Sequence, residues 1–218
     1  ITAGRAQLAL QTPAALASAD SYFGKAIANE ANNLEANLLK AATSLLLEQS
    51  SAQFQAQLTG VGVTINDNDI YNFLYTPPVD ADGFLNPTPG VTTNSTLTYI
   101  KSKIPLIDAA LANLGKFGNA TTRSFAIALN ESETATADVR IDYGDVLMLR
   151  ALLKGAKAFI ALMSSYNTTA EYAKIAYLEK NFNQYGKVTP QLILETFPDL
   201  MKLSTSDQRA AAKALIIA

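Results

Sequence analysis

The chain has 218 residues, of which 49% are hydrophobic and 17% charged, and its formal net charge is −2. It contains no cysteine and no histidine, which excludes disulfides, thiolate or imidazole catalysis, and metal sites built on Cys or His. With 17 basic and 19 acidic side chains and no basic cluster, the sequence predicts no positive surface for nucleic acid. The hydrophobic fraction is sufficient for a sizeable core.

The first sixty residues have the pattern of three successive helices. Thr12 followed by Pro13 is a strong start signal, because the hydroxyl can cap the first amides and proline fits the first turn. The connection 30–33 is short, so the third helix should fold back antiparallel to the second, and Gly60 should end it. The predicted helices span residues 1–10, 13–29 and 34–58.

Small and aromatic residues recur at fixed offsets in this region, namely Ala19, Phe23, Ala26, Asn33 and Ala41. Over residues 4–48 the pattern resembles the second half of one tetratricopeptide repeat and the start of the next. It departs from that family at Ala31, where the repeat usually has proline, and in extra residues in the first helix. The resemblance implies interlocking helical hairpins with a scaffold role or a surface that binds a protein or peptide.

Residues 60–93 form a long segment rich in Gly, Pro, Asn and Asp, and such long loops are usually functional or mobile. Its aromatic side chains are a candidate binding platform for a partner or a sugar, since aromatic groups with polar atoms are enriched at interfaces. Anchoring of the loop onto the core is the alternative interpretation. The candidate binding residues are Tyr71, Phe73, Tyr75 and Phe84.

The same segment places Asp80, Asp82 and Asn86 around Gly83. Closely spaced oxygen ligands and a glycine at a sharp turn are typical of calcium loops. The spacing is not that of an EF-hand, and a solvated turn is the alternative. Calcium is therefore the one cofactor that the sequence suggests.

The next residues predict a helix that is interrupted, followed by two strands. Asn94 or Ser95 is the expected cap of a helix over residues 95–117, and Pro105 should kink or break it near Lys103. Apolar residues then alternate with polar or small ones on both sides of a turn. This alternation predicts a small antiparallel β-hairpin near residues 122–141.

Residues 142–165 are the longest helical stretch and are apolar on nearly every side. Arg150, Lys154 and Lys157 form one narrow polar stripe, which interrupts the apolar run too often for a membrane span. A helix of this composition is usually surrounded by other elements, so the sequence predicts a central buried helix on which the β-hairpin packs. Asp142 and Asp145 are interpreted as caps at its start rather than as an acid–base pair.

Three shorter helices are predicted after the long one. Thr168 or Thr169 should cap the first, Thr189 followed by Pro190 repeats the threonine–proline start, and residues 204–207 should cap the last. These helices are expected over residues 169–182, 190–197 and 207–218.

The predicted fold is mainly α: stacked antiparallel helical hairpins, like tetratricopeptide repeats or an α-bundle, around the buried helix 142–165, with one small β-hairpin. We expect a single helical domain over 1–218, with hairpins in 1–59, the loop 60–93, and helices plus the β-hairpin in 94–218. Because the chain begins and ends inside helical patterns, we expect it to be an excerpt of a longer one.

These features predict a non-catalytic binding or scaffold domain that recognises a protein or peptide through a helical groove and the loop 60–93. The charge-poor surface must depend on Asn, Gln, Ser and Thr, which suggests an exported periplasmic or cell-surface protein, with a lipid anchor upstream as one form. The alternatives are a surface protein that binds or cleaves polysaccharide, which would need two facing carboxylates, and a calcium-stabilised structural module.

Overall fold

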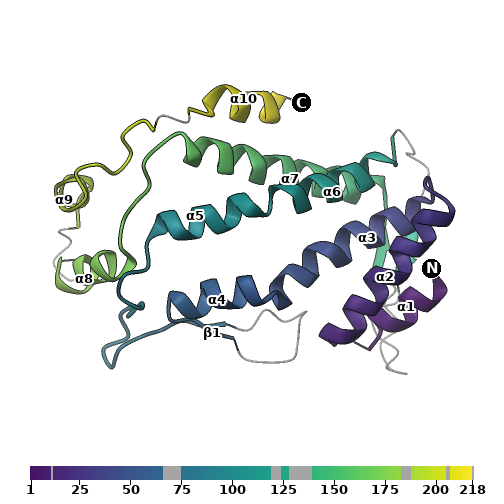
Figure 1. The fold of residues 1–218 in the computed structure, drawn as a ribbon, viewed down its shortest axis with the longest axis horizontal. Coiled ribbons are helices and arrows are strands. Elements are labelled where there is room, and N and C mark those ends of the chain that lie inside the picture. Colours follow the sequence, from purple (N-terminus) through teal and green to yellow (C-terminus); the bar gives the residue numbers. More distant parts are fainter. Residues whose placement is uncertain are drawn as a thin grey trace. The chain divides into compact units, whose positions relative to one another are not determined.

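The computed structural model describes residues 1–10, 12–65, 75–118, 124–127, 139–182, 188–204 and 207–217. Within these residues the protein is mainly helical, as the sequence predicts, with two pairs of short strands (Figure 1). The residues form two compact units that interleave along the chain. The first combines Ile1–Ser51 with Ile104–Lys154, and the second combines the described residues of 52–103 with those from Gly155 onward.

The first unit is built around α3. Helices α1 (Thr2–Leu8), α2 (Pro13–Asn29) and α3 (Leu34–Leu47) follow one another through short connections. α1 packs on α2, α2 packs on α3, and α3 also packs on α6 (Ile104–Gly115). Figure 1 shows the three N-terminal helices beside one another.

Side-chain caps begin α2 and α3. Thr12 Oγ1 accepts a hydrogen bond from the Ala15 N–H at 3.2 Å, which confirms the predicted threonine–proline start. Asn33 Oδ1 accepts one from the Ala36 N–H at 3.0 Å. Each cap satisfies an amide that the helix itself cannot pair, so both helix starts are determined locally.

The core of this unit lies where α1, α2 and α3 meet. Ala19, Phe23 and Leu39 are buried together, and Ile1 and Leu8 pack around them. Gly4 of α1 lies directly on the Phe23 ring, because a Cβ at that position would be 2.5 Å from Phe23 Cε1. The missing side chain at Gly4 therefore sets how closely α1 approaches α2.

Asp20 joins α2 to α3 on the polar side of the same helices. Its carboxylate accepts hydrogen bonds from Thr43 Oγ1 at 2.8 Å and from Ser44 Oγ at 2.7 Å, and it pairs with the Lys40 ammonium. A carboxylate with three donors is satisfied, so Asp20 has a structural explanation.

The strand β3 (Phe125–Ile127) pairs antiparallel with β4 (Val139–Ile141), with Phe125 opposite Ile141. Both strands fall in the region where the sequence predicts strands, and the rest of the predicted alternation, at 128–138, lies outside the described residues. Ile141 packs on the Phe23 cluster. The other side chains of both strands lie outside the described residues, so the expected packing of the hairpin on the long helix stays a prediction.

The third predicted helix, 34–58, is two helices. α3 ends at Leu47, a 3₁₀ turn covers Glu48–Ser50, and α4 begins at Ala52. Ser51 between them is extended, with ψ 138°, and its Oγ donates to Glu48 Oε1 at 2.7 Å. Serine side chains favour such local hydrogen bonds over continuation of a helix. The prediction of one helix relied on the spacing of apolar residues, which gives no information about these hydrogen bonds.

α7 (Tyr143–Ser164) is not the buried central helix that its composition predicts. Val146 is buried, but three large apolar side chains are mostly exposed. These are Met148, Leu152 and Phe159, at 60%, 63% and 59%. The helix passes from the first unit to the second between residues 154 and 155, so no single core surrounds it along its length.

The second unit contains a further set of short elements. They are α4 (Ala52–Gly60), β1 (Thr64–Ile65), β2 (Tyr75–Thr76), α5 (Thr93–Ser102), α8 (Tyr172–Phe182), α9 (Pro190–Thr196) and α10 (Arg209–Ile217). β1 pairs antiparallel with β2, and Ala170, Leu178 and Phe197 form a buried cluster at α8 and α9.

The predicted break between the helices α5 and α6 is confirmed. α5 ends at Ser102 and α6 begins at Ile104 with Pro105 in its first turn, so the break occurs where it was expected. The cap of α5 is Thr92 rather than Asn94 or Ser95.

The two later caps agree with prediction. Thr189 Oγ1 accepts from the Leu192 N–H at 3.1 Å at the start of α9. Asp207 Oδ1 accepts from the Arg209 N–H at 3.0 Å at the start of α10.

Replacing Gly4 by alanine should destabilise the first unit, because the new Cβ would overlap the buried Phe23 ring and overpacking costs about 1–3 kcal/mol. Gly24→Ala in α2 is the matched control, since its Cβ would meet only the end of the Lys40 side chain, at 3.9 Å. That variant should be as stable as the wild type or more so. Urea denaturation followed by circular dichroism measures both, and equal stability of the two variants would contradict the close packing of α1 on Phe23.

Candidate binding pocket

Three helices of the second unit each contribute one face to a single cavity. The contributing residues recur at i, i+3 and i+4, the spacing that places side chains on one side of a helix. They are Phe54, Gln57 and Leu58 from α4, Thr96, Tyr99 and Ile100 from α5, and Tyr172, Ile175 and Ala176 from α8.

The chain turns sharply after α4, which ends at Gly60 as predicted. The Val63 N–H donates to the Leu58 carbonyl at 2.9 Å, a bond typical of a Schellman helix end. Gly62 has φ +85°, and a Cβ there would lie 2.9 Å from Pro78 Cβ. Glycine is required for both the left-handed conformation and the contact with Pro78, which brings the loop against the end of α4.

The segment 77–87 supplies another wall of the cavity, through Pro77, Pro78, Leu85 and Pro87. Its two sides pair with each other through a bridge between Val79 and Leu85 and a hydrogen bond from the Asn86 N–H to the Pro78 carbonyl, at 2.7 Å.

Asp80 closes the turn in this segment. Its Oδ1 accepts hydrogen bonds from the N–H groups of Asp82 and Phe84, both at 3.0 Å. An aspartate that bonds to the amide two residues on is a common way to stabilise a turn.

Lys180 of α8 attaches this turn to the helix. Its Nζ lies 2.6 Å from Asp80 Oδ2 and 3.0 Å from Asp82 Oδ2, and 5.9 Å from the centre of the Phe84 ring. The hydrogen bond from Lys180 holds the pKa of Asp80 below its ordinary value. The hydrogen bonds to Asp80 and Asp82 raise the pKa of Lys180 in turn.

Backbone hydrogen bonds connect the start of α5 to the start of α8. The Thr93 N–H donates to the Ala170 carbonyl at 2.9 Å, and the Tyr172 N–H donates to the Val91 carbonyl at 3.0 Å. The two helices that carry Tyr99 and Tyr172 are therefore held together at one end by main-chain bonds.

This pairing explains why α8 begins later than predicted. Thr168 and Thr169 do not cap it, because α8 starts at Tyr172. The residues just before the helix use their backbone groups to bond to the other segment, and Thr93 Oγ1 donates to the Thr168 carbonyl.

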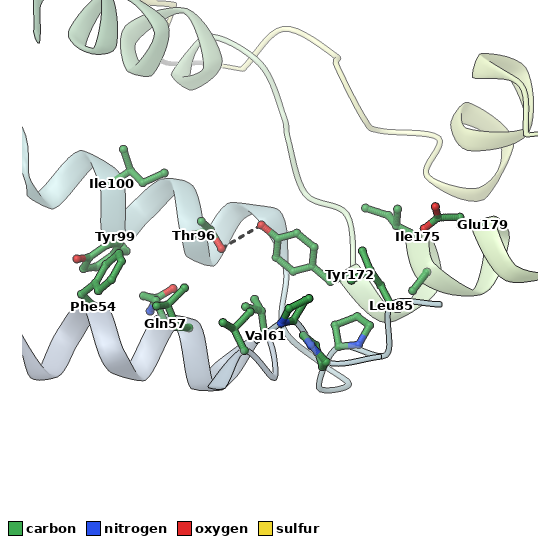
Figure 2. A pocket seen from close by; sticks show the side chains of 16 residues that line it. Phe54, Gln57, Val61, Leu85, Thr96, Tyr99, Ile100, Tyr172, Ile175 and Glu179 are labelled. Carbon is green, nitrogen blue, oxygen red and sulfur yellow. Dashed lines mark hydrogen bonds between the residues drawn. The ribbon is translucent and has the colours of Figure 1, made fainter. Parts of the chain in front are cut away.

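The cavity has a volume of about 360 Å³ and mostly apolar walls. This volume is at the lower end of the ~300–1,000 Å³ typical of ligand pockets. The rings of Phe54 and Tyr99 pack with centres 6.3 Å apart and planes inclined by 41°. The Tyr172 hydroxyl donates to Thr96 Oγ1 at 3.1 Å, as the dashed line in Figure 2 shows.

Glu179 of α8 is the carboxylate among the described residues that line the cavity. Figure 2 places it near Ile175, one helical turn away, and at the opposite end of the lining from Phe54 and Tyr99. The pocket is thus apolar and aromatic at one end and acidic at the other.

The predicted aromatic platform is described only in part. Tyr71 and Phe73 lie outside the described residues, and of Tyr75 the structure describes the backbone, opposite Ile65 in the β1–β2 pair. Phe84 is half-buried and lies beneath the Lys180 ammonium instead of lining the cavity.

The candidate calcium ligands are only partly brought together. Asp80 and Asp82 converge on the Lys180 ammonium, and Asn86 is exposed. Within the described residues no group of three or more acidic side chains is arranged to hold a metal ion. Calcium binding at this turn would have to displace Lys180.

Asp142 and Asp145 form a reciprocal cap at the start of α7. Asp142 Oδ1 accepts from the Gly144 N–H at 2.7 Å, and Asp145 Oδ2 accepts from the Asp142 N–H at 2.8 Å. The capping interpretation is confirmed, since these oxygens are engaged with the helix backbone.

Sequence reasoning missed most of the cavity lining. The i, i+3, i+4 spacing at Tyr172, Ile175 and Ala176 was a usable signal, and so was the same spacing in α5. No comparable signal exists for Val61, Val63 and the prolines, because their positions depend on the path of an irregular loop.

Comparison of the chain with protein-family models, curated proteins and solved structures finds no match. The function therefore has to be inferred from the pocket. No helix in the described part of the chain has both the length and the apolar character needed to cross a membrane.

Replacing Lys180 by methionine should raise the pKa of Asp80 towards 3.8, because the strongest influence that lowers it is removed. The recovery should be partial, since the amides of Asp82 and Phe84 still bond to Asp80. In the wild type, the pKa of Asp80 is lower in the folded protein than its ordinary value of 3.8. The ionised Asp80 therefore stabilises the folded protein above pH 3.8, and this stabilisation is lost as the pH falls through the lowered pKa. In Lys180→Met this acid-dependent loss should be smaller.

A carboxyl ¹³C NMR titration measures the pKa of Asp80 directly. Lys174→Met is the control, because Lys174 pairs with Glu171, at 3.6 Å, and not with Asp80. This variant should leave the pKa of Asp80 unchanged. An unaltered Asp80 pKa in Lys180→Met would contradict the pairing.

Calcium should leave the thermal midpoint of the protein unchanged relative to a chelator, because the Lys180 ammonium is already bound by the Asp80 and Asp82 carboxylates. A ligand that binds only the folded state raises the midpoint. A rise with calcium that disappears in Asp80→Asn would instead support the calcium-stabilised module.

Proposed function

We propose that this protein is a non-catalytic recognition domain whose second unit binds an apolar segment of another protein or a peptide. The observation that carries this proposal is the cavity in which faces of α4, α5 and α8 meet the segment 77–87. Concave, mostly apolar sites with a few polar groups are the usual form of binding pockets. In this proposal the ligand contacts a helical groove and part of the loop 60–93.

The composition of the walls favours a peptide as occupant. Phe54, Tyr99 and Tyr172 present large, stiff surfaces that lose little conformational entropy on binding. Proline side chains in the facing loop add rigid apolar contacts, and tyrosines are enriched among the residues that dominate binding energy. Aromatic-lined grooves of this kind recur in domains that bind extended peptides.

The polar groups of the pocket favour binding over hydrolysis. Cleavage of a polysaccharide needs two carboxyl groups on either side of the scissile bond. Among the described lining residues Glu179 is the single carboxylate. The chain also has no histidine or cysteine to serve as a base or nucleophile.

In this proposal the first unit is a scaffold of stacked helical hairpins in the manner of tetratricopeptide repeats. The burial of Ala19, Phe23 and Ala41 at α2 and α3 supports it, as does the Asn33 cap between the two helices. The protein is proposed to be exported, to a periplasm or a cell surface, on the strength of its charge-poor surface composition.

Selection of a random peptide library displayed on phage tests the binding proposal. Clones selected on the wild type are compared on two variants. Leu85→Asp puts a charge into the pocket wall and should weaken binding about tenfold or more, because an apolar ligand would bury it without a partner. Leu194→Asp makes the same change on α9, outside the pocket, and should leave binding unchanged. Leu194 is 46% exposed and Leu85 is 50% exposed, so the two positions are comparable.

Circular dichroism and thermal midpoints establish that both variants are folded. Clones that bind the wild type and Leu85→Asp equally, or a library with no clone that depends on the pocket, would refute the proposed function.

A further inference from the structure

Glu179 is a charged residue of the pocket wall that has no neutralising partner among the described residues. It is half-buried, and it makes no hydrogen bond or ion pair with any residue that the structure describes. The two nearest lysines of α8 are both engaged elsewhere. Lys174 Nζ lies 3.6 Å from Glu171 Oε2, and Lys180 is shared by the two aspartates of the 77–87 turn.

The described ion pairs near Glu179 carry a net negative charge. The single positive charge of Lys180 faces two carboxylates, and the Lys174–Glu171 pair is neutral. At the aromatic end, Lys103 Nζ lies 4.8 Å from the Tyr99 ring centre and 2.7 Å from Gln53 Oε1. Among the described residues that line the pocket, the negative charge therefore lies at the α8 end, and such a charge attracts a cationic ligand.

The apolar wall next to Glu179 also suits a particular kind of cation. Ile175 and Ala176 lie on the same face of α8, so a ligand that reaches the carboxylate passes over apolar surface. Lysine and arginine have long apolar stems below a charged head and can satisfy both surfaces at once. A partly dehydrated carboxylate gains a charge-assisted hydrogen bond from such a partner.

We infer that the bound segment carries a lysine or arginine beside the apolar side chain that fills the pocket, and that Glu179 selects this cation. The inference rests on the proposed function, which supplies the apolar part of the contact. The aromatic end with Phe54 and Tyr99 takes the apolar side chain, and the α8 end takes the charged one.

The same peptide library, selected in parallel on the wild type, Glu179→Gln and Glu195→Gln, tests the inference. Glu179→Gln removes the charge but keeps the shape of the side chain. Glu195→Gln makes the same change of net charge on α9, outside the pocket. Peptides from the wild type and from Glu195→Gln should combine an apolar residue with Lys or Arg, whereas peptides from Glu179→Gln should keep the apolar residue without the cation.

A double-mutant cycle on the best wild-type peptide measures the contact itself. Replacing its cationic residue by norleucine should weaken binding to the wild type about fivefold, a value typical of one partly exposed ion pair. The same replacement should have no effect on binding to Glu179→Gln. Added salt should weaken the wild-type complex more than the variant complex.

The two ideas fail in different ways. Pocket-dependent peptides with the same apolar motif and no cation on all three proteins would overturn the role of Glu179 and leave the proposed function standing. A cation preference that survives in Glu179→Gln would also overturn it. Peptides that are insensitive to Leu85→Asp would remove the proposed function and the inference together.

Discussion

The backbone bonds between Val91–Thr93 and Ala170–Tyr172 are the constraint on which the second unit depends. They join residues 77 and 81 positions apart in the chain (170 − 93 and 172 − 91) and place the first turns of α5 and α8 next to each other. These bonds fix the start of α5, which carries Tyr99, relative to the start of α8, which carries Tyr172. The Tyr172–Thr96 hydrogen bond and the Lys180–Asp80 ion pair add side-chain contacts to this main-chain pairing.

Several carboxylates of the protein have a structural role. Asp20 accepts three hydrogen bonds between α2 and α3, Asp142 and Asp145 cap α7, and Asp80 closes a turn that Lys180 holds. Asp20 and Asp80 are half-buried, and such charges are costly unless they are paired. Glu179 differs from them in having no such partner within the described residues, which makes it informative about a ligand.

The sequence predicts features that depend on neighbouring residues better than features that depend on distant parts of the chain. Thr12, Asn33 and Thr189 cap helices through bonds to amides three residues away, so their roles are visible in the sequence. Composition gave the wrong prediction for α7, because this apolar helix has exposed side chains at Met148 and Phe159. A helix that continues from one compact unit into another is not enclosed by either core, and no local pattern reports where one unit ends.

By itself, the sequence determined the helical character of the chain, most helix starts, the break at Pro105 and the exclusion of histidine and cysteine chemistry. These properties depend on side-chain type and on contacts within one or two helical turns. Only the tertiary structure decided that faces of three separate helices and a proline-rich loop surround one cavity, and that Glu179 belongs to its wall. The physical reason is that long-range backbone pairing brings these elements together, and the positions of its donors and acceptors do not depend on any one side chain.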